Sequence, residues 1–278
     1  MSPLGRRQLP LNLPYVGLDF VLGRDGRLYF LEANSVAAGI YYAELVSRRA
    51  AELMPELSPE LRGSLTLVRD FVGMCSEYHR ILRGGPMRTV AITVPERWKS
   101  YLARERKRLL EEFRAVGVEA FFLKESSSEV RDGLLVATVG GREVIPDLIV
   151  RRTYKFPREI SQPVVTPSRA GKITGSKWKS YKAVRKFIEM RPDAANWIAL
   201  PETVLAKTPR RAKAVAERFL EEGKSVVIKP IKGSGGKGIL FIERRSELDS
   251  LPNQENYWPA VVQEEVDVLP LIGCDGRP

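Results

Sequence analysis

The amino-acid sequence predicts an α/β (α+β) protein. Runs of β-branched and aromatic residues alternate with segments whose apolar residues recur every three or four positions. Clusters of Gly, Pro and Ser near residues 84–86 and 157–167 separate these segments, as linkers between domains do. With 44% hydrophobic residues over 278 positions, the chain is long enough for one or two domains with a core.

The first predicted element is a β-hairpin from Tyr15 to Asn34. YVGLDFVL and RLYFLEAN have strand composition, and Gly23 to Gly26 form the predicted turn. A helix from Ile40 to Met54 follows and is ended by Pro55.

A long amphipathic helix is predicted next, with Ser58 as its N-cap and Pro59 as its first residue. Its apolar residues recur at intervals of three and four up to Leu82, and Gly84, Gly85 and Pro86 end it. This helix would link the hairpin region to the domain that follows.

From Met87 to about Tyr154 the pattern predicts a small α/β domain. The strand candidates are RTVAITV, VEAFFL, LLVATV and DLIVRR. One helix is expected between the first two, with Trp98, Tyr101, Leu102, Leu109, Leu110 and Phe113 on its apolar side. Two further helices should begin around Ser176 and at Thr208 and Pro209, and Gly223 should end the second.

A glycine-rich loop stands between two strand-like runs in SVVIKPIKGSGGKGILFIE. The glycines satisfy Gly-x-Gly-x-x-Gly, but ILFIE has strand rather than helix composition, so a dinucleotide fingerprint is excluded. No Gly-Lys-Ser/Thr closes a Walker loop. A strand-loop-strand flap remains, whose backbone N–H groups and Lys229 could approach a triphosphate. A hairpin turn without a ligand is the alternative.

Three polar residues of the predicted hairpin suggest a metal site. Glu32 and Asn34 are two positions apart, so both side chains leave the same face of one strand. Asp19 lies inside an apolar run, where an unpaired carboxylate is costly to bury. Carboxylate and amide oxygens are the ligands that Mg²⁺ takes when phosphates also hold it. The alternative is a polar strand edge facing solvent.

Composition limits the remaining function classes. With only Cys75, Cys274 and His79, a zinc site or a His-based triad is excluded. The net charge of +11 is dispersed along amphipathic helices, which favours a solvated basic surface over a nucleic-acid footprint. No apolar run is long enough to span a membrane, and residues 1–20 lack a signal-peptide core, so we expect a cytoplasmic protein.

The segment GLDFVLGRDGRLYFLEANSVAAGI resembles the closing part of an ATP-grasp domain, close to the D-alanine:D-alanine ligase branch. That resemblance implies Asp19, Glu32 and Asn34 as magnesium ligands. The family often continues Asn-Thr-Ser-Pro-Gly, whereas here Asn34 is followed by Ser-Val-Ala-Ala-Gly. The loop on the substrate side therefore departs from the family pattern.

A later part of the chain is similar to the opening half of the same fold. TGSKWKSYKAV resembles its Lys-bearing helix, LPET the segment that follows, and AVVQEEV the strand whose backbone contacts adenine. The resemblance implies that Lys177 and Lys229 contact phosphates and that Glu264, Glu265 and Val266 contact adenine. The implied flap consists of Gly233, Ser234, Gly235, Gly236, Lys237 and Gly238.

The order of these parts is unusual. Residues 1–55 resemble the end of a module, 56–86 a linker helix, 87–160 the small domain that precedes ATP-grasp, and 161–278 the beginning of a module. VLPLIGCDGRP resembles the linker before an Asp-x-Arg strand in spore-coat-associated ATP-grasp proteins. The chain could be part of a longer tandem protein or a circular permutant. We favour the tandem account, because joining the two ends leaves out the Asp-x-Arg strand.

The resemblance implies a ligase that uses ATP and Mg²⁺ to activate a carboxylate as an acyl phosphate, which an amine or thiol then attacks. Lys229 would be its catalytic residue, stabilising charge on the phosphoryl group in transit. The partners would be small carboxylate and amine substrates, and possible further partners include the rest of a tandem chain. The alternatives are a non-catalytic nucleotide-binding or structural protein and, less favoured, a nucleic-acid binder.

Overall fold

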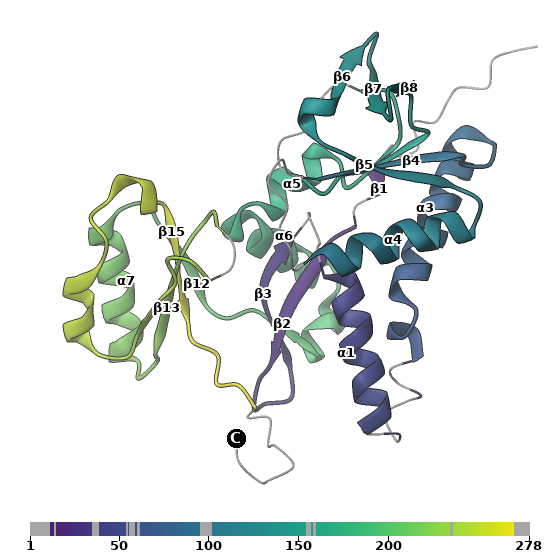
Figure 1. Ribbon diagram of the computed structural model, residues 1–278. Helices are drawn as coiled ribbons and strands as arrows, with labels where there is room; N and C mark the ends of the chain where they lie inside the picture. The colour runs from purple at the N-terminus through teal and green to yellow at the C-terminus, as the bar shows by residue number, and fades with distance from the viewer. Residues whose placement is uncertain are drawn as a thin grey trace, which may run out of the picture. The chain divides into compact units, whose positions relative to one another are not determined.

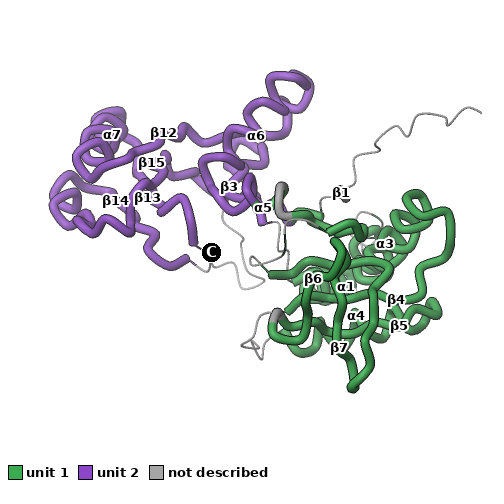
Figure 2. The backbone as a smooth tube through the Cα atoms, turned by 90° about the horizontal axis from the view of Figure 1, so that it is seen from above, with its two compact units in different colours: residues 1–16, 35–171 green, residues 17–34, 172–278 purple. Residues whose placement is uncertain are grey.

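The computed structural model describes residues 12–13, 15–34, 39–53, 55, 59, 62–94, 102–153, 157, 160–233 and 236–269. The chain forms two compact units, coloured separately in Figure 2. Unit 1 contains Met1–Val16 and Ser35–Gly171, and unit 2 contains Gly17–Asn34 and Lys172–Pro278. The predicted hairpin therefore lies in the same unit as the glycine-rich flap.

Unit 1 is built on a five-stranded parallel sheet. Its order is β1 (Asn12–Leu13), β10 (Val164–Val165), β9 (Leu148–Val150), β4 (Thr89–Thr93) and β5 (Glu119–Leu123). Successive residues of a strand point to opposite faces, and here both faces are covered. Val90 and Ile92 pack against the helices, whereas Ala91 packs against a second, smaller sheet.

The helices of unit 1 cover one face of this sheet, and a three-stranded antiparallel sheet covers the other (Figure 1). The helices are α1 (Ile40–Leu53), α3 (Leu67–Arg83) and α4 (Ala103–Ala115). The small sheet consists of β6 (Ser128–Arg131), β7 (Leu134–Val139) and β8 (Arg142–Val144). LLVATV was predicted as a strand of the alternating α/β pattern, but as β7 it is the centre of the small sheet.

The predicted long helix is not continuous from Pro59, although Pro59 itself is helical. Residues Arg62–Ser64 form a 3₁₀ turn, the helix begins at Leu67, and Ser58 lies outside the described residues. A tertiary contact explains this start, because the buried Glu44 carboxylate on α1 accepts a hydrogen bond from the Val68 N–H at 3.0 Å. The predicted end is confirmed, since Gly84 has φ 75° and its N–H bonds to the Arg80 carbonyl.

Unit 2 contains two sheets. The first is antiparallel, with the order β12 (Thr203–Ala206), β15 (Ala260–Glu264), β13 (Val226–Pro230) and β14 (Leu240–Ile242). Helix α7 (Pro209–Glu221) packs on this sheet through Val215 and Phe219. As predicted, Thr208 caps this helix by accepting from the Arg211 N–H at 3.3 Å, and Gly223 ends it at φ 76°.

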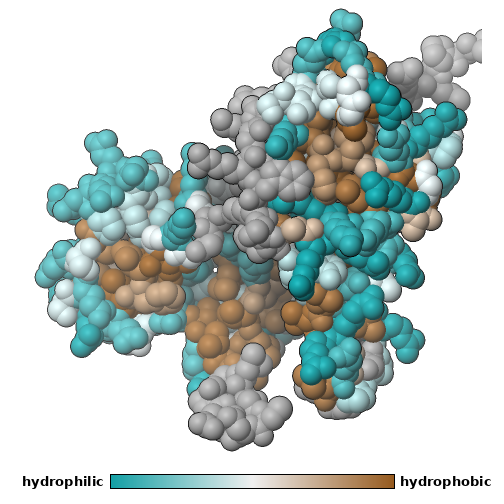
Figure 3. Space-filling view, in the orientation of Figure 1, coloured by the Kyte–Doolittle hydropathy of each residue, from teal (hydrophilic) through white to brown (hydrophobic). Residues whose placement is uncertain are grey.

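The second sheet of unit 2 contains the predicted hairpin, which is confirmed as β2 (Gly17–Leu22) and β3 (Leu28–Asn34). β3 also pairs in parallel with β11 (Ile198–Ala199), and α6 (Lys177–Met190) packs against it. The exposed apolar residues of the hairpin include Leu18, Leu22 and Leu28, and apolar surface is visible over it in Figure 3.

The remaining helical segments are short. They are α5 (Ser168–Thr174) and the 3₁₀ turns η4 (Glu125–Ser127), η5 (Pro192–Asn196), η6 (Arg245–Ser250) and η7 (Glu255–Tyr257). Within the described part of the chain, no helix has the length and apolar character needed to cross a membrane.

Unit 1 depends on a buried charge. Glu105 on α4 is fully buried, forms an ion pair with Arg152, and accepts hydrogen bonds from the N–H groups of Gly39 at 2.7 Å and Tyr41 at 3.1 Å. Glu105→Ala removes the buried carboxylate that pairs with Arg152 and accepts from two backbone N–H groups, so it should lower the free energy of unfolding by about 3–5 kcal/mol. Urea denaturation followed by circular dichroism measures this loss.

The control for this prediction is Glu111→Ala on the same helix. Among the described residues Glu111 pairs with Lys107 alone, at 3.8 Å and in an exposed position, so its removal should change the free energy of unfolding by at most about 0.5 kcal/mol. Equal effects of the two substitutions would contradict a special role for Glu105.

Candidate active site

A cavity of about 170 Å³ lies within unit 2. It is bordered by the hairpin, by the first residue of α6 and by the β13–β14 flap. Its lining residues are Asp19, Leu31, Glu32, Lys177, Lys229, Pro230, Gly233, Gly236, Lys237 and Ile239. The fold thus brings together carboxylates from one end of the sequence and ammonium groups from the other.

The two carboxylates face each other across the hairpin. Asp19 pairs with Glu32 in the β2–β3 register, and the register shifts immediately after Asp19. Asn34 Nδ2 donates to Asp19 Oδ2 at 3.1 Å and to Glu32 Oε1 at 3.3 Å. Desolvation by neighbouring protein atoms and the adjacent Glu32 raise the pKa of the Asp19 carboxyl, although the residue as a whole is exposed. Two acids held this close favour binding of a cation.

The residues present fit a magnesium ion that is shared with phosphates. Asp19, Glu32 and Asn34 can supply hard oxygen ligands, once a half-turn of the Asn34 amide brings its oxygen in place of its nitrogen. Among the described residues, no group of three or more His, Cys, Asp or Glu side chains could hold a metal ion. The protein oxygens would therefore fill only part of the coordination shell, as is usual for Mg²⁺ bound with a nucleotide.

Lys177 stands at the start of α6, where Ser176 caps the helix by accepting from the Lys179 N–H at 3.4 Å. The Lys177 N–H bonds to the Ile231 carbonyl at 3.0 Å, which fixes the helix end next to the flap. Lys177 Nζ lies 3.3 Å from Glu32 Oε2 and donates to the Gly233 carbonyl at 3.1 Å. One ammonium group thus contacts both the acidic hairpin and the flap.

Lys229 lies on β13 and is buried with 9% exposure. Its Nζ donates to Gln263 Oε1 at 2.7 Å, and Gln263 Nε2 donates to Thr203 Oγ1 at 2.8 Å. Burial lowers the pKa of Lys229, Glu32 opposes this shift, and Lys177 adds to it. Gln263 and Thr203 were not predicted. The signal for Gln263 was a polar residue inside the apolar run AVVQEEV, because such residues are seldom buried without a partner.

The predicted strand-loop-strand form of this segment is confirmed, because β13 and β14 are antiparallel strands on either side of the glycine loop. Gly233, Gly236 and Gly238 have φ values of 123°, 72° and 75°, which side chains other than glycine seldom adopt. A Cβ on Gly238 would also lie 3.3 Å from the Pro230 ring, and Tyr257 Oη donates to the Gly238 carbonyl at 2.8 Å. Ser234 and Gly235, also predicted for the flap, lie outside the described residues.

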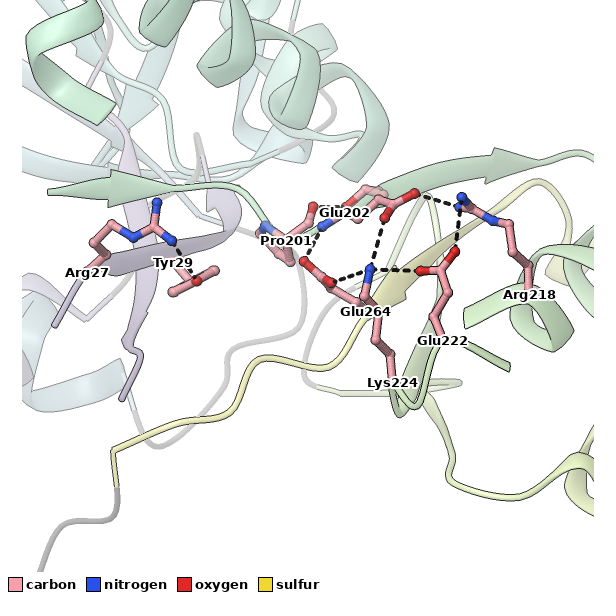
Figure 4. Close-up of polar contacts among 9 residues, drawn as sticks. Arg27, Tyr29, Pro201, Glu202, Arg218, Glu222, Lys224 and Glu264 are labelled. Atoms are coloured by element: carbon pink, nitrogen blue, oxygen red, sulfur yellow. Dashed lines mark hydrogen bonds and ion pairs between the residues drawn. The ribbon is translucent and has the colours of Figure 1, made fainter. Parts of the chain in front are cut away.

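The predicted adenine-contacting residues Glu264, Glu265 and Val266 are at the end of β15 and just beyond it, and they are not among the residues that line the cavity. The Glu264 carboxylate accepts from the Glu202 N–H at 2.7 Å and lies 3.3 Å from Lys224 Nζ (Figure 4). The Glu264 side chain is therefore occupied by contacts within the protein, and any contact of this residue with adenine would come from its backbone.

An ion cluster surrounds this strand end (Figure 4). Lys224 Nζ lies 2.9 Å from Glu222 Oε2 and 3.2 Å from Glu202 Oε2, and Arg218 also pairs with Glu202 at 2.6 Å. The carboxylates raise the pKa of Lys224 above its usual range. The cluster fixes the direction in which the chain leaves β15.

The sequence of residues 170–262 matches the family described as YheC/D like ATP-grasp. No curated protein matches the chain. Among solved structures, a glutathione synthetase like-effector (GSS30) from Globodera pallida aligns with a TM-score of 0.58 and 13% identity over 92% of this chain. A candidate gamma-glutamylcysteine synthetase from Methylobacillus flagellatus KT aligns with a TM-score of 0.55 and 13% identity over 91% of it.

These findings confirm the predicted resemblance to the ATP-grasp superfamily, and the chain has an ATP-grasp fold of mixed α/β type. Within that superfamily, residues 170–262 are similar to the YheC/D type. The chain spans 62% of the Globodera pallida protein and 68% of the Methylobacillus flagellatus protein.

The raised pKa of Asp19 gives a prediction for the ligand-free protein. Below the unfolded pKa of about 3.9 the group is protonated in both states, and above the raised folded pKa its ionisation disfavours folding. Asp19→Asn removes this penalty at neutral pH and should raise the free energy of unfolding by about 0.5 kcal/mol or less, since Asp19 is exposed. Urea denaturation at pH 3.5 and pH 7 measures the difference.

Asp25→Asn in the turn of the same hairpin provides a control of opposite sign. Hydrogen bonds from the backbone N–H and guanidinium of Arg27 lower the pKa of Asp25, so its charge stabilises the fold at neutral pH and the substitution should destabilise it. A loss of stability with Asp19→Asn at pH 7 would contradict repulsion between Asp19 and Glu32.

Proposed function

We propose that this protein is a Mg-ATP-dependent ligase that activates a carboxylate as an acyl phosphate and transfers the acyl group to an amine or thiol. The observation that carries the proposal is the cavity in unit 2, where the Asp19 and Glu32 carboxylates lie with Lys177, Lys229 and the glycine flap. This combination suits a triphosphate with its metal, because it offers anionic ligands for the cation and cationic groups for the phosphates.

Each part has a distinct role in the proposed mechanism. Asp19, Glu32 and Asn34 would hold Mg²⁺, which neutralises charge on the β- and γ-phosphates when bound. Lys229, oriented by Gln263 in a buried position, would stabilise negative charge on the phosphates as the γ-phosphoryl group moves to the substrate carboxylate. N–H groups of the flap would hold the phosphates and exclude water.

The proposal includes a single site formed within one chain. Residues 17–34 and 172–278 belong to one compact unit, and β3 pairs with β11 in that unit. This arrangement supports a site to which both segments of the chain contribute. The acid and amine substrates are proposed only by chemical class, because residues that select them usually lie in variable loops.

Thermal-shift titration with ATP, with and without Mg²⁺, tests nucleotide binding. At 100 times the Kd, Mg-ATP should stabilise the protein by about 2.7 kcal/mol, which is a shift of several degrees. Lys229→Met and Glu32→Gln should each remove most of this shift if the two segments form one site. Lys213→Met, which alters only an exposed pair with Asp249 in the same unit, should keep it.

A full Mg-ATP shift in the Lys229→Met protein would contradict the proposed site. Loss of the shift with Lys229→Met but not with Glu32→Gln would mean that the hairpin does not contribute to nucleotide binding, as the tandem account expects.

Trapping with hydroxylamine distinguishes a ligase from a non-catalytic nucleotide-binding protein. An acyl phosphate reacts with hydroxylamine to give a hydroxamate, so incubation with Mg-ATP and a panel of small carboxylates should yield hydroxamate and ADP with at least one acid. Lys229→Met should lower this yield by about 100-fold, the effect typical of losing one electrostatic group. Nucleotide binding without hydroxamate from any acid would favour the non-catalytic alternative.

A further inference from the structure

Lys177 occupies the part of the acidic hairpin where a cation would bind. Its ammonium lies 3.3 Å from Glu32 Oε2, while the other oxygen of that carboxylate, Oε1, accepts from Asn34. Both oxygens of Glu32 therefore have partners in the ligand-free protein. The Lys177 side chain is 11% exposed, so this ion pair is shielded from solvent far more than the surface pairs of this chain.

The same ammonium is connected to the flap. Lys177 Nζ donates to the Gly233 carbonyl at 3.1 Å, and its backbone N–H bonds to Ile231 at 3.0 Å. Gly233 has φ 123° and stands at the first turn of the glycine loop. The backbone of Lys177 is thus held by Ile231, and its ammonium contacts both Glu32 of the hairpin and Gly233 of the flap.

The charges around the cavity discriminate between a free metal ion and a metal with its nucleotide. Three lysines, Lys177, Lys229 and Lys237, are among its lining residues, with only two acidic residues, Asp19 and Glu32. A free divalent cation therefore meets a net positive surrounding and must also displace Lys177 from Glu32. Metal-bound ATP is anionic, and its phosphates offer Lys177 a new partner as the metal takes its place.

We infer that Lys177 acts as a resident cation at the metal site, so that the hairpin binds a divalent ion only together with nucleotide. The inference rests on the proposed function and adds a regulation of the same site. On nucleotide binding the ammonium would leave Glu32 Oε2 and the Gly233 carbonyl for a phosphate, which frees both the metal ligand and the flap. If the Lys177–Glu32 ion pair were purely structural, removing Lys177 would instead lower the stability of the protein without strengthening metal binding.

Binding of Mn²⁺ measured by electron paramagnetic resonance tests the inference on the full chain. The wild-type protein should bind Mn²⁺ at least tenfold more tightly with a non-hydrolysable ATP analogue than without it. Lys177→Met should bind Mn²⁺ without nucleotide at least tenfold more tightly than the wild type. Addition of Glu32→Gln to this variant should abolish the gain, because the freed carboxylate is the ligand.

Two variants serve as controls. Lys177→Arg keeps the positive charge and should keep free Mn²⁺ excluded, and Lys179→Met removes an exposed charge from the same helix and should behave as the wild type. Nucleotide-free Mn²⁺ affinity of Lys177→Met within twofold of the wild type would overturn the inference.

The wild-type comparison stands even if Lys177→Met does not fold. Equal Mn²⁺ affinity with and without nucleotide in a wild type that binds Mg-ATP would also overturn the inference. Absence of any Mg-ATP shift in the wild type is a different failure, because it removes the proposed function. The Mn²⁺ affinities of the wild type and Lys177→Met without nucleotide test the inference whether or not Mg-ATP binds.

Discussion

The candidate site depends on backbone pairing along both edges of the β2–β3 hairpin. On one edge β3 pairs in parallel with β11, and the Leu28 N–H bonds to the Trp197 carbonyl at 2.8 Å. On the other edge the Leu269 N–H bonds to the Leu22 carbonyl at 2.9 Å. Arg24 and Asp267 also form an ion pair there, but both side chains are exposed, so the backbone bonds contribute more. These contacts hold the acidic residues beside the lysines.

The segment that follows β15 has two structural roles. At its start, Glu264 is held by the Lys224 cluster and Glu265 bonds through its N–H to the Ser225 carbonyl at 2.8 Å. A few residues later the same segment bonds to the hairpin. The strand predicted to contact adenine is therefore continuous with the segment that supports the proposed metal ligands. Few residues separate the two, so a shift of one would be transmitted to the other.

Elements defined by local chemistry were predictable from sequence, and elements defined by distant partners were not. Thr208 and Gly223 mark the start and end of α7, and the strand-glycine-strand pattern predicts the flap. In both cases the signal lies within the element itself or at its ends. The start of α3 depends on Glu44 of another helix, and β11 has only two residues, so neither has a local signal. The small sheet of unit 1 was missed although Asp132-Gly133 and Gly140-Gly141, all at positive φ, mark two tight hairpin turns.

For the candidate site, the sequence identified the residue types but not their assembly. Asp19, Glu32, Lys177, Lys229 and six flap residues were named from motifs, whereas the contact of Lys177 with Glu32 joins positions 145 residues apart. The spacing of residues along the sequence carries no signal for a contact between positions so far apart. Gln263 was missed for a similar reason, because its importance comes from Lys229 on the neighbouring strand.

The separation of the hairpin from β11 in the chain has a consequence for biosynthesis. Leu28 leaves the ribosome roughly 10 to 30 s before Ile198, at a translation rate of about 5–20 residues per second. An isolated two-stranded hairpin is marginally stable in water. During that interval nearly all of unit 1 is synthesised and can fold, while the hairpin has two unpaired edges and lacks the later elements of unit 2 around Phe30, which is buried in the complete fold. The nascent chain is therefore most exposed to aggregation at the strands that later carry the acidic residues.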